Sequence, residues 1–227
     1  MTPRAAACPQ CGRPVVSHAA TPFLASGLCP ACLFATAASI DDEECPYRVL
    51  APIEQDGQGI TYLAERCASS VRGYVALTVI AGGNGEAILS RFHELRPALG
   101  RLHHPGAGKV LDAGSTADGS VYVASEYVAG TTLSETASRQ LLDRSQRSAI
   151  ARQLTEIVGA AHAAGVVHLD LDRSKVRVAT AGGLRGSITG FGLSVIVAGR
   201  AGSPDRDLAA LDALIREYDL QFHPAQG

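Results

Sequence analysis

Short apolar runs, either alternating with polar residues or nearly continuous, dominate the first half of the chain. They cover residues 47–53, 60–66, 74–80, 108–114 and 120–128. Runs of this length that are rich in Val, Ile and Tyr and bounded by Gly are typical of β-strands. One helical pattern lies among them at 86–102, where apolar residues recur every three or four positions, although Pro97 disfavours its second half. The pattern therefore predicts five strands and one helix.

The second half of the chain changes to longer helical patterns. A weak one covers residues 133–142 and a clear one covers 144–164, and Gly165 follows as a residue type that often ends helices in the left-handed conformation. Residues 166–171 are strand-like, 176–193 are typical of a β-hairpin, and 204–218 have an amphipathic helical pattern. Strands with one helix, followed mainly by helices, predict an α+β fold in two lobes.

Four of the six cysteines precede these elements and form two Cys-x-x-Cys pairs separated by 17 residues. The pairs are Cys8 with Cys11 and Cys29 with Cys32. This spacing lets two short turns close a tetrahedral thiolate shell around Zn²⁺, which leaves no coordination position for chemistry. A redox dithiol is the alternative, but it would need a thioredoxin-like strand and helix around it. We predict a structural zinc ribbon over residues 1–35 and a linker over 36–46.

The composition is typical of a soluble globular protein, since 46% of the 227 residues are hydrophobic and 19% are charged. The formal net charge is −2, so no broad basic face for nucleic acid or anionic lipid is predicted. The first residues contain no apolar run of signal-peptide length, and no apolar run elsewhere is long enough to span a membrane. We therefore expect a cytoplasmic location, with no nucleic-acid or membrane partner.

One short segment, His168-Leu169-Asp170-Leu171-Asp172, gathers an imidazole and two carboxylates. These residue types fit acid–base catalysis, metal binding or an ordinary solvated turn. The segment alone does not discriminate between the three uses, so the rest of the chain has to be considered.

The order of the elements resembles a eukaryotic-type protein kinase of the bacterial serine/threonine class. The resemblance extends from Tyr47 to Tyr218. In the first half, YRVLAPIEQDGQGITYLAE matches the glycine-rich loop, VALTVI matches the third strand and EYVAGTTL matches the hinge. In the second half, VVHLDLDRSKV matches the catalytic loop, and SITGFGLS matches the strand that carries Asp-Phe-Gly in the family. The resemblance implies a kinase-like N-lobe over residues 47–125 and a truncated, mainly helical C-lobe over 126–227. A zinc ribbon ahead of such a domain is similar to an arrangement in bacterial kinases.

Carried over by position, the resemblance also implies where a nucleotide and a catalytic base would lie. Asp170 matches the Asp that serves the family as the base, and Asp207 matches an Asp in the first turn of a later helix. The positions that match the nucleotide cleft are Gly57, Gly59, Ala76, Glu126 and Val128.

Several positions that phosphoryl transfer depends on have lost the required residue type. Thr78 replaces the Lys that contacts the phosphates, and Leu95 replaces the Glu that orients this Lys. Gly190 replaces the metal-binding Asp of Asp-Phe-Gly, and Lys175 replaces the catalytic-loop Asn. No Lys precedes Lys109, so a neighbouring lysine cannot substitute. We therefore expect neither ATP nor Mg²⁺ to bind.

The leading hypothesis is a catalytically inactive pseudokinase that acts as a binding, scaffold or regulatory module in signalling. A protein partner would then cover the open surface of the truncated C-lobe. One alternative is an atypical ATP-dependent serine/threonine kinase that has rebuilt its site, with Asp170 as the base and Lys175 as a phosphate clamp. Another is a nucleic-acid binder that uses the ribbon, but Arg4 and Arg13 are its only cations before residue 48.

The cysteine spacing predicts that the purified full chain holds about one zinc ion per molecule. Cys11→Ser and Cys29→Ser should each lower the zinc content strongly, because each removes one ligand of a closed shell. Cys67→Ser is the matched control and should leave it unchanged, since Cys67 stands alone in the sequence. Elemental analysis by mass spectrometry measures the stoichiometry, and a zinc-free wild-type protein would contradict the ribbon.

Overall fold

The computed structural model describes residues 6–7, 14–15, 46–56, 59–67, 73–80, 84–116 and 120–221. Two short strands at the start, β1 (Ala6–Ala7) and β2 (Pro14–Val15), pair in an antiparallel manner. The expected zinc ligands Cys8, Cys11, Cys29 and Cys32 lie outside the described residues, as does Gly57 of the glycine-rich loop. The zinc ribbon therefore stays a prediction.

The chain divides into two compact units. The first consists of Met1–Gly85 and Ala113–Ala124, and the second of Glu86–Asp112 and Ser125–Gly227. Strands β6 (Ala107–Ser115) and β7 (Val121–Glu126) each contribute residues to both units. Helix α2 (Gly85–Arg101), which the resemblance assigns to the N-lobe, falls almost entirely in the second unit.

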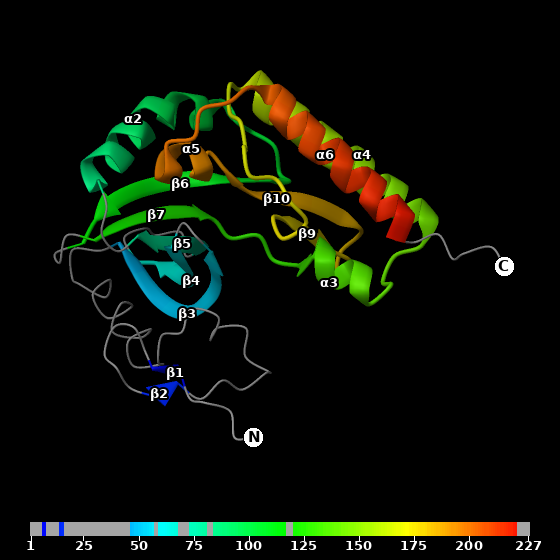
Figure 1. The fold of residues 1–227 in the computed structure, drawn as a ribbon, viewed down its shortest axis with the longest axis horizontal. Helices are drawn as coiled ribbons and strands as arrows, with labels where there is room; N and C mark the ends of the chain where they lie inside the picture. Colours follow the sequence, from blue (N-terminus) through cyan, green and yellow to red (C-terminus); the bar gives the residue numbers. More distant parts are fainter. Residues whose placement is uncertain are drawn as a thin grey trace. The chain divides into compact units, whose positions relative to one another are not determined.

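Antiparallel pairing builds the first unit. Strands β3 (Tyr47–Asp56), β4 (Gly59–Arg66) and β5 (Tyr74–Ile80) pair in chain order, and β7 follows β5 in the sheet (Figure 1). Side chains that alternate along these strands form its core. Its buried side chains include Tyr62, Ala64, Val75, Leu77, Val79 and Val123. The structure thus has strands where the apolar runs predicted them.

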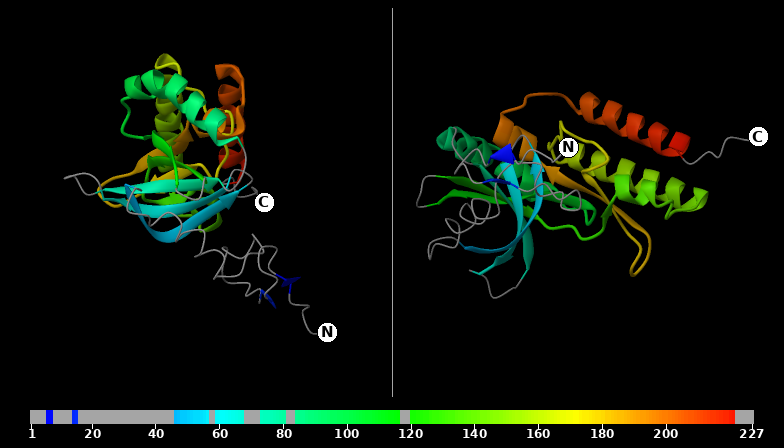
Figure 2. Two further views of the ribbon diagram at one scale, coloured as in Figure 1. Left: turned by 90° about the vertical axis from the view of Figure 1, so that its left-hand side faces the viewer. Right: turned by 60° about the horizontal axis from the view of Figure 1, so that its bottom comes forward.

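A second set of strands and most of the helices form the second unit. Its strands lie in the order β6, β10 (Arg185–Phe191), β9 (Val176–Ala179) and β8 (Thr131–Thr132), with β10 parallel to β6 and antiparallel to β9. Helix α4 (Arg144–Ala163) packs on β10, and α6 (Pro204–Gln221) runs beside α4, as Figures 1 and 2 both show. The apolar side chains between these elements are Ile150, Leu154, Ile157, Val158, Ile188 and Leu211.

Local sequence signals set the ends of two of these helices. Thr132 and Glu135 form a reciprocal capping box at the start of α3 (Leu133–Ser138), and Asp143 and Gln146 do the same for α4. Each box satisfies backbone N–H groups that have no partner within the helix.

As predicted, α4 stops at Gly165, whose φ is +81°. The Val166 N–H then donates to the Ala161 carbonyl at 2.9 Å, which closes the helix end.

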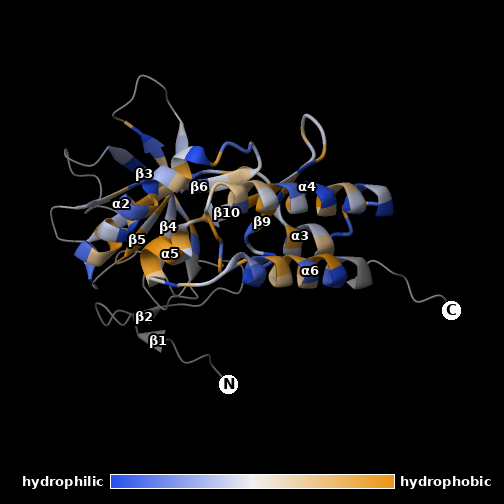
Figure 3. Cartoon of the chain, turned by 90° about the horizontal axis from the view of Figure 1, so that it is seen from above, coloured by the Kyte–Doolittle hydropathy of each residue, from blue (hydrophilic) through white to orange (hydrophobic). Residues whose placement is uncertain are grey.

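Other segments differ from the sequence prediction. Residues 166–171 form a loop instead of a strand, because the N–H groups of His168 and Leu169 bond to a side chain of α6. Helix α2 continues through Pro97, which lies on its exposed side, so the helix loses a single backbone bond there. The apolar residues that follow β10 form a helix, α5 (Leu193–Ala198), and Figure 3 shows its hydrophobic colour.

In the part of the chain that the structure describes, no helix combines the length and the apolar character that a membrane crossing requires.

The core of the second unit should depend on Ile157, which is 1% exposed in α4 and faces Gly106. Replacing it with Ala removes buried methyl groups and leaves a cavity, so we expect Ile157→Ala to lower the free energy of unfolding by about 2–5 kcal/mol. Leu208→Ala, at a position that is 48% exposed, is the control and should cost much less. Urea unfolding measures both, and equal effects would argue against this core.

Candidate functional site

A buried carboxylate in the first turn of α6 holds the loop that contains the HLDLD residues. Asp207 is 1% exposed, and its oxygens accept hydrogen bonds from both helix and loop. Oδ2 accepts from the His168 N–H at 2.7 Å and from Nε2 of His162 at 2.9 Å, while Oδ1 accepts from the Leu169 N–H at 2.7 Å. Hydrogen bonds to an ionised acceptor are stronger than neutral ones. Asp207 therefore fixes the backbone where the loop begins.

The next residue of this loop has an unfavourable backbone conformation. Leu169 has φ of +63°, in the left-handed region, and its side chain is 1% exposed. A non-glycine residue in this region costs on the order of 1–3 kcal/mol and persists only where the surroundings hold it. The bond from its N–H to Asp207 and the burial of its side chain provide that support.

His168 is packed inside the second unit. Its Nε2 lies 2.8 Å from the Thr189 carbonyl oxygen, which can only accept, so Nε2 carries the proton. Nδ1 accepts from the Asp170 N–H at 3.3 Å, and the ring meets Phe191 edge-on with 5.2 Å between centroids. Burial lowers the pKa of the imidazole below its ordinary value. The neutral ring therefore braces the loop through both nitrogens.

Asp170, the position of the family's base, is bonded to a cation of the same chain. Its side chain is 34% exposed, and its Oδ1 accepts from Nη1 of Arg200 at 2.6 Å. The same Nη1 lies 3.3 Å from the Leu169 carbonyl oxygen. Arg200 comes from the segment between α5 and α6, and no sequence motif pointed to it because its contact depends on the tertiary fold.

Asp172 closes a tight turn after the base position. Its Oδ1 accepts from the Ser174 N–H at 2.7 Å, from the Ser174 hydroxyl at 2.6 Å and from the Lys175 N–H at 3.3 Å. Burial raises the pKa of this carboxyl, but the bonds from Ser174 and the charge of Lys175 outweigh it and leave the pKa below its ordinary value. Asp172 is thus engaged as an ionised turn-former.

Backbone groups and an apolar contact occupy the end of β10 and the residues next to it. Gly190 has φ of +87°, a conformation that disfavours any side chain. Lys175, at the family's Asn position, is 9% exposed, and its carbonyl oxygen accepts from the Thr189 N–H at 2.9 Å. Leu95 of α2 lies at the position of the family's Glu. A Cβ at Gly192 would lie 3.0 Å from the Leu95 side chain, so this position is used for packing.

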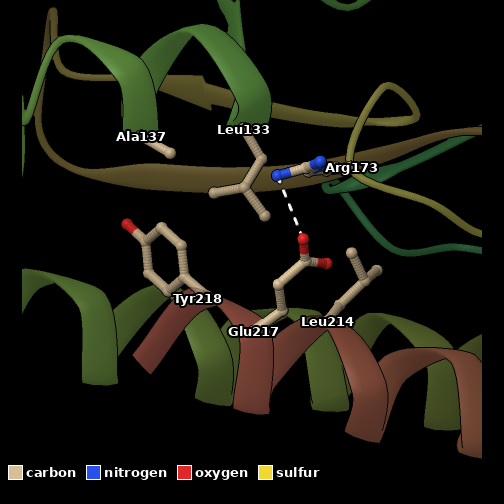
Figure 4. A pocket seen from close by; sticks show the side chains of 6 residues that line it. All are labelled: Leu133, Ala137, Arg173, Leu214, Glu217 and Tyr218. Carbon is tan, nitrogen blue, oxygen red and sulfur yellow. Dashed lines mark ion pairs between the residues drawn. The ribbon is translucent and has the colours of Figure 1, made fainter. Parts of the chain in front are cut away.

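Two hollows lie close to this loop. One has a volume of about 180 Å³ and is lined by Leu169, Asp170, Leu171, Asp172, Arg206, Asp207 and Ala210. The other lies between α3 and α6, and it is lined by Leu133, Ala137, Leu214 and Tyr218 and by the ion pair of Arg173 with Glu217 (Figure 4). Within the described ranges, no group of three or more His, Cys, Asp or Glu side chains is placed to hold a metal ion.

In the first unit, the position of the phosphate-binding Lys holds a satisfied hydroxyl. Thr78 of β5 is 2% exposed, and its Oγ1 lies 2.8 Å from Oγ1 of Thr61, its cross-strand partner in β4. Ala76 is half-buried opposite Leu63 on the same pair of strands. Gly59 begins β4, while the side-chain surroundings of the glycine-rich loop are not described.

The two hinge positions lie in the second unit. The Glu126 carboxylate accepts from the Lys109 N–H at 3.4 Å, and a Cβ at Gly108 would lie 3.0 Å from Val128. The Lys109 ammonium donates to the carbonyls of Leu99 and Leu102 at 3.0 and 2.6 Å. This lysine is therefore committed to the end of α2, and the nucleotide-binding role of Glu126 and Val128 stays a prediction.

The buried neutral His168 predicts a pH dependence of stability. The unfolded chain takes up a proton on this residue near pH 6.5, whereas the folded chain takes it up only at lower pH. Stability should therefore fall as the pH drops below about 6.5, until the lower pKa of the folded state is passed. The unfolding free energy measured at pH 7.5 and 5.5 should differ less in His168→Gln than in the wild type. The exposed His103→Gln is the control, and equal pH dependence in all three proteins would contradict this assignment.

The sequence comparisons find kinases. The chain is 35% identical over 135 residues to serine/threonine-protein kinase pkn3 of Myxococcus xanthus, covering 58% of this chain and 24% of that protein. It is 28% identical over 151 residues to the probable serine/threonine-protein kinase CPE1738 of Clostridium perfringens, covering 65% and 21%. The chain thus spans a quarter or less of the length of the curated relatives it matches. No protein-family model matches.

The structure comparisons find the same fold. Two crystal structures of the PknI kinase domain of Mycobacterium tuberculosis, one of them a C20A mutant, superpose with TM-scores of 0.61 and 0.60 at 22% identity. They cover 80% and 76% of this chain, and 75% and 73% of theirs. The α+β architecture predicted from the sequence agrees with this likeness. The chain has a protein-kinase-like fold, and its sequence relatives are bacterial serine/threonine-protein kinases.

Proposed function

We propose that this chain is a catalytically inactive pseudokinase that acts as a binding, scaffold or regulatory module. The observation that carries the proposal is the buried hydroxyl pair of Thr78 and Thr61 at the position of the phosphate-binding Lys. A hydroxyl cannot neutralise the phosphate charge that the family's Lys meets. The pair is also satisfied without any ligand.

The metal positions support the same function. Mg²⁺ is held in kinases by an Asp and an Asn. At the matching positions Gly190 offers no oxygen from a side chain, and Lys175 adds a positive charge close to the Asp172 carboxylate. Oxygen ligands are what Mg²⁺ requires, and a nearby ammonium group opposes its binding. The residues present therefore fit neither Mg²⁺ nor the triphosphate it accompanies.

The packing of α2 supports it further. In kinases an ion pair between a Glu of this helix and the Lys aligns the phosphates. Here Leu95 packs at Gly192 instead, and Glu94, the preceding residue, accepts a bond from Ser90 on the same helix at 3.3 Å. An apolar residue at this position is consistent with the loss of its Lys partner, because a lone buried carboxylate would be costly.

The remaining parts of the proposal concern where the module is located and what it binds. A cytoplasmic location, a structural Zn²⁺ on Cys8, Cys11, Cys29 and Cys32, and a protein partner are proposed from the sequence alone. A scaffold role needs no bound nucleotide, since binding surfaces of a kinase fold can be used without phosphoryl transfer.

An atypical kinase is the second candidate, and the intact loop favours it. Asp170 remains partly exposed in a loop that Asp207 holds firmly, so a base could be presented there if its bond to Arg200 opened. Autophosphorylation from labelled ATP that disappears in Asp170→Asn would support this candidate over the pseudokinase.

Thermal unfolding with nucleotide tests the proposed function. Millimolar Mg-ATP should leave the melting temperature of the full chain unchanged, as should ATP with EDTA. A site with a dissociation constant of about 10 µM would instead be stabilised by roughly 2.7 kcal/mol at about 1 mM ligand, which corresponds to several degrees. An active kinase domain serves as the positive control. A Mg²⁺-dependent rise of that size would refute the pseudokinase proposal.

A further inference from the structure

The segment that joins α5 to α6 lies directly on the loop of Asp170. We refer to residues 199–203 as the strap. Its Arg200 donates to the Asp170 carboxylate at 2.6 Å and to the Leu169 carbonyl at 3.3 Å. Two residues later, a Cβ at Gly202 would lie only 2.7 Å from Cδ2 of Leu169. The strap therefore lies close against the Leu169 side chain at position 202.

The start of the strap is also held in place. Gly199 ends α5 with φ of +61°, where other residues are strained. Arg91 of α2 donates to the carbonyls of Ile196 and Val197 at 2.5 and 3.1 Å, which satisfies the end of α5. A Cβ at Gly199 would lie 3.2 Å from the guanidinium carbon of Arg91. The strap thus leaves α5 in a direction that α2 helps to define.

Its other end is continuous with the helix that positions the loop. Ser203 lies just before the start of α6. Its carbonyl accepts a hydrogen bond from the Arg206 N–H at 3.2 Å, and its hydroxyl donates to the Asp205 carboxylate at 3.1 Å. Asp207, one turn further on, holds the backbone of His168 and Leu169. The loop and the strap are therefore tied to the same helix, which keeps Arg200 opposite Asp170.

We propose that the strap is a built-in cover of the Asp170 loop, in which the Arg200 guanidinium occupies the Asp170 carboxylate and excludes a substrate group from it. The ion pair is about one-third exposed, so its charge attraction alone is partly screened by water. The Leu169 carbonyl contact and the close fit of Gly202 add to it. This inference goes beyond the proposed function, because it holds whether or not the chain binds a nucleotide.

Chemical labelling of carboxylates tests the cover directly. The full chain is treated with a water-soluble carbodiimide and an amine, and the rate of amide formation at each carboxylate is followed by mass spectrometry. Asp170 should react about five to ten times faster in Arg200→Gln than in the wild type, because the guanidinium no longer occupies it. Arg216→Gln, which breaks a surface ion pair with Asp212 on α6, is the matched control and should leave Asp170 as slow as in the wild type. The exposed Glu94 gives the internal reference rate.

Hydrogen exchange provides the second readout. The Arg200 N–H is bonded to the Ser194 carbonyl, so exchange in residues 199–203 reports on the strap. This exchange should rise about tenfold in Arg200→Gln and less in Arg200→Lys, which keeps the charge. If Arg200→Gln does not fold, tryptic cleavage after Arg200 should be faster in Asp170→Asn than in the wild type.

Equal labelling of Asp170 in wild type and Arg200→Gln, with unchanged exchange, would overturn the cover. Failure of the proposed function is separate from this outcome. It would appear as stabilisation by Mg-ATP, which none of the labelling measurements includes.

Discussion

The second unit depends on one buried charge. The Asp207 carboxylate is almost completely removed from water, which is costly for an ionised group unless donors surround it. The donors come from two elements, the last turns of α4 and the loop that follows it. Because α6 supplies the carboxylate, a single side chain links two helices to the loop. Without it, a buried leucine at φ of +63° would lose the hydrogen bond to its N–H.

Several polar and packing positions in each of the two units are satisfied within the chain. Thr78 bonds to Thr61, Leu95 packs against Gly192, and the Lys109 ammonium ends α2. Thr78 and Leu95 lie at positions that serve nucleotide binding in a working kinase, and Lys109 is a cation that could replace the missing Lys. Each of the three has a neighbour of matching chemistry in its own unit. The two hydroxyls and the ammonium therefore need no bound nucleotide to offset their burial. This is the physical content of the pseudokinase proposal.

Sequence reasoning predicted the elements better than the contacts. The strands, the hairpin and the stop of α4 at Gly165 followed from periodicity and glycine, which act locally. The loop at 166–171 has the β-branched and apolar residues of a strand, and only the distant Asp207 explains why it is not one. The contacts of Arg200 and Arg91 likewise join residues about 30 and 105 positions apart. Long, flexible side chains give no periodic signal of their partners.

The way the chain passes between its two units has a consequence for any attempt to dissect it. The path changes unit after Gly85, after Asp112 and after Ala124, so neither unit is one continuous stretch of sequence. No single cut can release a unit with all of its strands. A fragment that ended before β7 would expose the edge of β5, and unpaired strand edges invite association between molecules. Removal of either unit would therefore cut strands β6 and β7, which the two units share.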